Sequence, residues 1–188
     1  MKLAVSGDPG SFSEEAGRIY SQREGMEPEL VFATDMRGVL AAVDAGEVDQ
    51  GIFPVVNSRG GLVYPAFEAM GEFQFKMIGE LWMEVFQCIM VLPGTVAEDI
   101  TEITSHSQAL AQCDRYLKKI FPTVELKEWQ DTAKAAKDLH DGVLPATAAV
   151  IAPARSAQIY GLEIIGKGIQ DQRPNLTTFI VVEKKIRY

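Results

Sequence analysis

Residues 51–61 read GIFPVVNSRGG and join a short apolar run to an abrupt polar end. The first six residues have the length and the β-branched content of a buried strand. The amide of Asn57 and the hydroxyl of Ser58 follow at once, and two glycines then give the backbone freedom to turn. This stretch therefore predicts a strand that ends at the rim of a ligand pocket.

Before this strand, short apolar runs alternate with amphipathic stretches, which is the pattern of βαβ units in an α/β fold. The expected elements are strands at 3–5 and 29–32, a helix that starts at Ser11, and a helix at 35–45 that stops at Gly46. Ser11 and Glu14 form a capping box at the start of the first helix, which would turn Phe12, Ala16 and Ile19 inward.

After this strand, the sequence from about 73 to 92 is almost continuously of β type, interrupted near Gly79. We expect the chain to cross there into a second lobe, so that lobe 1 holds 1–78 and 165–188 and lobe 2 holds 79–164. The later elements are expected as a strand at 103–104, a helix with Leu110, Cys113, Leu117 and Ile120 on one side, a strand at 124–126, a helix at 131–140, a strand at 147–152, a helix ending at Gly161, and a strand at 177–182.

Strand-to-helix turns recur at 7–13, 104–107, 130–132 and 152–155. In a parallel α/β sheet such turns lie at the carboxyl ends of the strands, where ligands bind. Backbone N–H groups at helix starts can hold a carboxylate without lysines. The pattern predicts an anion-binding cleft with Asn57 and Ser58 in one wall.

The composition narrows the class of partner. The chain has 188 residues, 47% of them hydrophobic and 23% charged, with a formal net charge of −8. Such an acidic protein lacks the basic footprint that nucleic acid or an anionic membrane requires. Cys88 and Cys113 show no metal-ligand spacing, and the N-terminus has no signal-peptide pattern, so we expect reduced thiols, no metal and a cytoplasmic location.

Four stretches together resemble one family, the prephenate dehydratases. DPGSFSEEA at 8–16 resembles the family's G-P-x-G-T-F-S-x-x-A, and FPVVNSRGG at 53–61 resembles P-I-E-N-S-x-x-G. SHSQALAQC at 105–113 resembles S-H-P-Q-A-L-x-Q-C, and 160–179 resembles Y-G-L … I-x-D … N-x-T-R-F. The motifs occur in the family's order and span nearly the whole chain.

The resemblance implies a two-lobed α/β fold, similar to type II periplasmic binding proteins, with the ligand cleft between the lobes. It implies conversion of prephenate to phenylpyruvate in phenylalanine biosynthesis, with loss of carbon dioxide and hydroxide. It further implies no cofactor and a homo-oligomer. Family members also carry a C-terminal ACT regulatory domain, which we expect to be lacking here because the sequence stops at Tyr188.

The resemblance also assigns residues. Thr177 matches the family threonine and is the candidate donor of a hydrogen bond or proton to the departing hydroxyl. The expected substrate-binding residues share hydroxyl, amide or backbone donors within the motifs, and they are Ser11, Ser13, Asn57, Ser58, Gly61, Ser105, His106, Gln108, Thr178 and Phe179. For His106, a purely structural role as a helix cap is the alternative.

Two departures from the family pattern leave the reaction open. Val56 stands where the family has Glu, and Thr178 where it has Arg; Ser107 for Pro is milder. A carboxylate and a guanidinium could form an ion pair, so losing both at once leaves neither charge without its partner. Arg59 and Arg173 are the candidate replacement cations. The sequence is compatible with three interpretations: a dehydratase, a prephenate decarboxylase that keeps the hydroxyl, and a non-catalytic binding protein.

Overall fold

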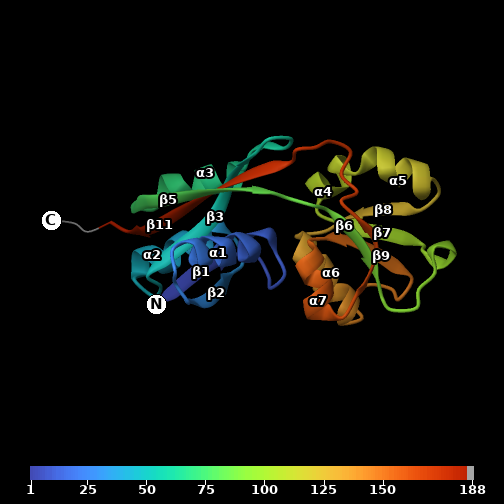
Figure 1. Ribbon diagram of the computed structural model, residues 1–188, viewed down its shortest axis with the longest axis horizontal. Helices are drawn as coiled ribbons and strands as arrows, with labels where there is room; N and C mark the ends of the chain where they lie inside the picture. Colours follow the sequence, from blue (N-terminus) through green and yellow to red (C-terminus); the bar gives the residue numbers. More distant parts are fainter. Residues whose placement is uncertain (186–188) are drawn as a thin grey trace. The chain divides into compact units, whose positions relative to one another are not determined.

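The structure is a computed structural model that describes residues 1–185, and its chain divides into two compact units. Unit 1 contains Met1–Asp8, Phe12–Glu84 and the described residues from Asn175 onward. Unit 2 contains Pro9–Ser11 and Val85–Pro174. Each unit is a sheet with helices on both faces (Figure 1). The prediction of an α/β protein with two lobes is confirmed.

Unit 1 is built on a six-stranded sheet in the order β2-β1-β3-β11-β5, with β4 paired to β3. Its elements are β1 (Lys2–Ser6), α1 (Phe12–Arg23), β2 (Glu29–Ala33), α2 (Met36–Ala45), β3 (Gln50–Asn57), β4 (Gly61–Leu62), α3 (Tyr64–Glu72), β5 (Phe75–Glu84) and β11 (Leu176–Lys184). Strands β1, β2 and β3 are parallel, whereas β11 runs antiparallel to both β3 and β5. The start of β11 therefore lies beside the end of β3.

The two faces of this sheet are covered by different helices. Helix α1 covers one face, where Gly17 closely approaches Val5. Helices α2 and α3 cover the other, where Phe53 and Ile180 are buried. Successive residues on a regular strand point to opposite faces, but β3 shifts register against β11 between Pro54 and Val56, and Val55 and Val56 both pack against the α2/α3 core.

Unit 2 is built on a five-stranded sheet in the order β10-β6-β9-β7-β8. Its elements are β6 (Cys88–Val91), η1 (Ala97–Asp99), β7 (Glu102–Ser105), α4 (Ser107–Gln112), α5 (Asp114–Ile120), β8 (Glu125–Glu128), α6 (Thr132–His140), β9 (Ala148–Ala152), α7 (Ala154–Tyr160) and β10 (Glu163–Lys167). Helices α4 and α5 pack on one face of this sheet, and α6 and α7 pack on the other (Figure 1).

The two units differ from the predicted lobes in three segments. Residues 79–84 lie in unit 1, because β5 pairs with β11 without a break until Glu84. Residues 165–174 lie in unit 2, where β10 pairs with β6. Pro9–Ser11 also lies in unit 2, because Ser156 Oγ donates a hydrogen bond to the Gly10 carbonyl and Tyr160 donates one to the Pro9 carbonyl.

Several local expectations need correction. The β-type run ends at 85–87, whereas near Gly79 strand β5 continues and only shifts its register against β11, between Met77 and Gly79. The helix expected with Leu110, Cys113, Leu117 and Ile120 on one side is two helices that meet at Cys113, and the first of them is capped by His106. Ile19 and Ile120 are exposed, and Tyr20 and Phe121 are buried instead. The errors at Ile19 and Ile120 are each one residue in helical phase.

Candidate active site

The end of β3 and the start of β11 bring three polar side chains together in unit 1. Thr177 lies directly opposite Asn57 in the β11–β3 ladder. Asn57, Asn175 and Thr177 are all buried, with exposed fractions of 6%, 0% and 7%. Buried polar groups need hydrogen-bond partners, so their geometry defines the site.

The amide of Asn57 is held in one orientation. Its Oδ1 accepts hydrogen bonds from the backbone N–H groups of Arg59 and Gly60, at 2.9 and 2.7 Å. Because two donors converge on that atom, it is the oxygen and the other terminal atom is the nitrogen. The Nδ2 group donates one hydrogen bond to Asn175 Oδ1 and one to Thr177 Oγ1, both at 2.8 Å. Asn57 thus joins the turn at 57–60 to the threonine.

This network fixes what the Thr177 hydroxyl can do. A hydroxyl has one proton and two acceptor lone pairs. One lone pair of Thr177 Oγ1 accepts the Asn57 hydrogen bond, and the hydroxyl proton has no acceptor within the described residues. The hydroxyl of Thr177 therefore keeps its proton for a further acceptor, and that this acceptor is a ligand stays a prediction.

The neighbouring turn supports this arrangement. The backbone N–H of Ser58 donates to the Leu176 carbonyl at 2.8 Å, and the Leu176 N–H donates to Ser58 Oγ at 2.9 Å. Ser58 itself is exposed, so its hydroxyl proton can turn toward a ligand. Gly61 has φ of 76°, in the left-handed region that favours glycine.

Ser6, Ser11 and Ser13 are buried around the start of α1. The hydroxyls of Ser6 and Ser13 are 2.9 Å apart and share a hydrogen bond. Helix α1 begins at Phe12, directly after Ser11, as the capping box predicts. A ligand role for Ser11 and Ser13 stays a prediction.

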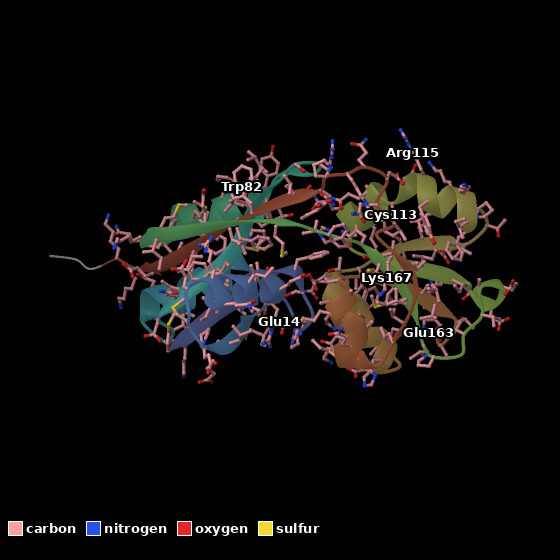
Figure 2. The ribbon with its side chains drawn as sticks, in the orientation of Figure 1. Glu14, Trp82, Cys113, Arg115, Glu163 and Lys167 are labelled. Carbon is pink, nitrogen blue, oxygen red and sulfur yellow. The ribbon has the colours of Figure 1, made fainter. Side chains whose placement is uncertain are left out.

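The two departures from the family pattern form the next rung of the same ladder. Val56 lies opposite Thr178, and Thr178 in turn lies opposite Trp82 on β5. Val56 packs against the α2/α3 core, so this rung faces the side of the sheet away from Thr177. Trp82 is 63% exposed on the outer strand (Figure 2). The two positions are cross-strand neighbours, as the idea of mutual support requires, but they do not share a face with the catalytic candidate.

Two further predicted residues have structural roles. Phe179 is 1% exposed and belongs to the packed interior of unit 1, so it is not placed to touch a ligand. Ser105 is fully buried, and its hydroxyl donates to the Ile151 carbonyl at 2.6 Å. The hydroxyl proton of Ser105 is therefore already used within unit 2.

In unit 2 the ends of β7, β8 and β9 form one edge of the sheet. His106 follows β7, and its Nδ1 accepts a hydrogen bond from the Gln108 N–H at 3.2 Å. This is the capping role given as the alternative. At the same edge, a hollow of about 500 Å³ is lined by Glu128, Trp129, Gln130, Lys134 and Asp138. Asp138 is buried there and accepts hydrogen bonds from Trp129 Nε1 and Lys134 Nζ.

The two candidate replacement cations are placed differently. The backbone of Arg59 belongs to the Asn57 turn, on an exposed loop of unit 1. The guanidinium of Arg173 donates to the Gly168 carbonyl at 2.9 Å and lies 5.3 Å from the centre of the Phe86 ring, all within unit 2. The side chain of Arg173 is thus held by its own loop.

Sequence reasoning missed Asn175 and three glutamines. Gln87 Nε2 donates to Gln112 Oε1 at 3.2 Å, and the Gln87 backbone N–H donates to Gln170 Oε1 at 3.1 Å. Asn175 and Gln112 both lie inside the motifs, but only the ladder and the helix phase show what their amides touch.

Within residues 1–185 no group of three or more His, Cys, Asp or Glu residues gathers to hold a metal ion. Cys88 and Cys113 are free and buried, and burial, with the nearby Asp171 charge, raises the pKa of Cys113 to about 12 (Figure 2). In the same part of the chain, no helix is both long and apolar enough to cross a membrane.

Comparison with solved structures places the fold. A prephenate dehydratase from Arthrobacter aurescens, solved in complex with L-Phe, matches with a TM-score of 0.86 and 24% identity, over 100% of this chain and 61% of that one. A periplasmic substrate-binding protein of an ABC transporter from Coxiella burnetii matches with a TM-score of 0.53 and 14% identity, over 98% of this chain and 84% of that one. The predicted likeness to periplasmic binding proteins is confirmed at the level of fold.

Comparison of sequences gives the family. Arogenate dehydratase 5, chloroplastic, of Arabidopsis thaliana is 34% identical over 185 residues, which are 98% of this chain and 42% of that protein. The chain thus spans less than half the length of this relative. The family profile described as "Prephenate dehydratase" matches residues 3–187. The chain belongs to the prephenate dehydratase family, a family of carbon–oxygen lyases.

Proposed function

We propose that this chain catalyses the decarboxylating dehydration of prephenate or of its amino counterpart, arogenate. The observation that carries the proposal is the Asn57–Thr177 hydrogen bond, in which Thr177 Oγ1 is the acceptor and keeps its own proton to donate. The reaction breaks the bond to the ring carboxylate and the bond to the ring hydroxyl. Carbon dioxide and water leave, and the ring becomes aromatic.

The proposed role of Thr177 is to donate a proton to the departing oxygen as the electron pairs move. The electron pair of the carbon–carboxylate bond moves into the ring, and the pair of the carbon–oxygen bond leaves with the hydroxyl. The Thr177 proton goes to that departing oxygen, and solvent water later restores it. A threonine hydroxyl is a weak acid, so general acid catalysis needs help at the oxygen that loses the proton. The Asn57 N–H group, 2.8 Å from Oγ1, supplies that help by stabilising the developing negative charge.

The second candidate is decarboxylation with the hydroxyl retained. It is favoured by the loss of both charged family residues at Val56 and Thr178. The position of this rung argues against it, since Val56 packs toward α2 and α3 while Thr177 keeps its partner. A non-catalytic binding protein is the third candidate, and the intact Asn57–Asn175–Thr177 network counts against it as well.

The test is product analysis with purified protein. Prephenate and arogenate are incubated separately at mildly alkaline pH, and products are identified by mass and ultraviolet spectrum, with Thr177→Val in parallel. We expect phenylpyruvate or phenylalanine, and almost none with the variant. A decarboxylated product that keeps its hydroxyl would establish the second candidate. Unchanged substrate that raises the melting temperature would establish a binding protein.

The wider setting is also proposed. We infer a role in phenylalanine biosynthesis from the family, and the acidic surface suits a cytoplasmic enzyme. We further propose a homo-oligomer, because the outer strand β5 exposes Met77 and Trp82 by 49% and 63%. Light scattering after gel filtration measures the mass directly, and a monomer at micromolar concentration would contradict this.

A further inference from the structure

A row of four side chains crosses the α2/α3 face of the unit 1 sheet, and the proposed reaction does not use it. Val56 on β3 lies opposite Leu62 on β4 and opposite Thr178 on β11. Thr178 in turn lies opposite Trp82 on β5. Facing side chains on neighbouring strands are about 5 Å apart, so the row is continuous. Its two ends are exposed, Leu62 by 49% and Trp82 by 63% (Figure 2).

The row continues onto helix α3, which packs on the same face of the sheet. Tyr64 opens this helix two residues after Leu62 and is 70% exposed, and Phe67 is 43% exposed. Residues three apart are neighbours on the surface of a helix, so Tyr64 and Phe67 extend the row on its β4 side. We call the row together with Tyr64 and Phe67 the unit 1 patch.

The two departures from the family pattern lie in the middle of this patch. Val56 stands where the family has Glu, and Thr178 where it has Arg. A carboxylate and a guanidinium at these positions would have to give up water before another surface could cover them, and that desolvation is costly. With Val and Thr instead, no charged side chain stands in the row between Leu62 and Trp82. The departures therefore make this surface easier to bury.

The size of the patch fits one side of a protein interface. A large aromatic side chain buries about 150–250 Å², so the exposed fractions of Leu62, Tyr64, Phe67 and Trp82 correspond to roughly 500 Å² of apolar surface. One side of a standard interface buries about 800 Å², of which about 60% is non-polar. The patch supplies that non-polar share.

The two ends of the patch carry opposite charges. Arg59 belongs to the exposed turn that precedes β4, whereas Glu80 and Glu84 flank Trp82 on β5 and share its face. A surface with a cation at one end and carboxylates at the other is complementary to a second copy of itself in the opposite direction. The charges thus favour a copy of this chain as the partner.

We propose that two copies of this chain pack their unit 1 patches against each other across a two-fold axis, an inference that rests on the proposed homo-oligomer. The Leu62 end of one copy covers the Trp82 end of the other. Trp82 then loses its contact with water, and the acidic end of each patch meets the turn that carries Arg59.

Sedimentation velocity over a range of protein concentrations tests this interface. Trp82→Lys should raise the dissociation constant of the dimer by at least about a hundred-fold, because the change occurs twice in a two-fold dimer and buried tryptophans dominate interfaces. Val143→Lys is the matched control: Val143 is also 63% exposed, but it lies in unit 2. Its dissociation constant should equal that of the wild type.

A charge exchange tests the direction of the two patches. Leu62→Glu alone should also weaken the dimer. In the double variant with Trp82→Lys, the introduced carboxylate of one copy meets the introduced ammonium of the other. The dissociation constant should then recover by at least about tenfold relative to Trp82→Lys alone.

Tryptophan emission gives a second measurement that needs no disruptive variant. Trp82 and Trp129 are the two tryptophans of the chain. Emission should shift to shorter wavelength as the concentration of wild-type protein rises, and Trp82→Phe should abolish the shift. Melting temperatures identify any variant that fails to fold.

The outcomes separate this inference from the proposals on which it rests. A wild-type monomer overturns the inference and the proposed homo-oligomer together. A dimer that survives Trp82→Lys, an emission that does not shift, or a double variant without recovery overturns the inference alone. Product analysis with prephenate and arogenate tests the proposed reaction independently of all three results.

Discussion

Two neighbouring rungs of the β3–β11 ladder differ in how their residues match the family motif. Asn57 and Thr177 keep the family residues, are buried, and hold one another through a 2.8 Å hydrogen bond. Val56 and Thr178, one residue away on each strand, have replaced the family's Glu and Arg. The side-chain period of a strand is two, so the second pair points to the other face of the sheet.

This difference teaches that adjacency in sequence is a poor guide to adjacency in a site. Read along the chain, the two departures lie immediately beside the residues expected to do chemistry. In the ladder they form a separate pair with Leu62 and Trp82 as lateral neighbours. A change that is shared by both members of such a pair can occur without leaving a lone charge on the sheet. The following predictions test whether the two rungs are independent, from the largest expected effect to the smallest.

Replacing the threonine on the first rung should have the largest effect. In Thr177→Val the shape is kept and the proton donor is lost, so kcat should fall by about 10²–10⁴-fold. Thr178→Val, the same change on the second rung, should alter kcat by less than about threefold. Steady-state kinetics with both substrates measures this. Equal losses in the two variants would show that both rungs serve the reaction.

Reversing the hydrogen bond between Asn57 and Thr177 should have the next largest effect on kcat. Asn57→Asp keeps an oxygen for the backbone N–H groups of Arg59 and Gly60. The introduced carboxylate accepts rather than donates, so the Thr177 proton turns toward it. We expect kcat to fall by roughly ten- to hundred-fold, with a smaller change in KM. A variant with full kcat would show that the direction of this hydrogen bond is irrelevant.

Removing the support behind Asn57 should have a moderate effect. Asn175→Ala leaves one proton of the Asn57 amide without an acceptor in a fully buried position. The free energy of unfolding should fall by about 1–3 kcal/mol in a denaturant titration. Because Asn57 would then hold Thr177 less firmly, kcat should fall by roughly tenfold. Asn175→Asp retains the acceptor oxygen and should recover part of kcat; no recovery would mean that Asn175 acts only through packing.

Restoring the family charges on the second rung should have the smallest effect on activity. Val56→Glu alone should destabilise the protein, because its partly buried carboxylate would have no cross-strand partner. Adding Thr178→Arg should recover about 0.2–1 kcal/mol through the cross-strand pair. Unfolding of the two single variants and the double variant measures this coupling. If the double variant gained activity many-fold, the two rungs would not be independent.

Local signals in the sequence predicted many of the elements. Asp35 and Asp131 accept hydrogen bonds at the starts of α2 and α6, and Gly46 and Gly161 end α2 and α7 in the left-handed region. Helix α3 and strand β10 were not predicted at all. Helix α3 follows the short strand β4, and few polar residues mark where it begins. Strand β10 is a short edge strand with a bulge between Ile164 and Gly166. Both depend on contacts that local propensity does not encode.

The sequence by itself determined the fold class, the family and the identity of Asn57, Ser58 and Thr177 as site candidates. The fold class follows from hydrophobic periodicity and capping residues, whereas the family and Thr177 follow from the resemblance of the four motifs and from their order. Only the tertiary structure decided how the candidates are buried and hydrogen-bonded. It turned Phe179 into the core, used the Ser105 proton on Ile151, and paired Val56 with Thr178 on the α2/α3 face. It also showed the hydrogen-bond partners of Asn175 and Gln87, because the fold brings together residues that are 83 to 120 positions apart.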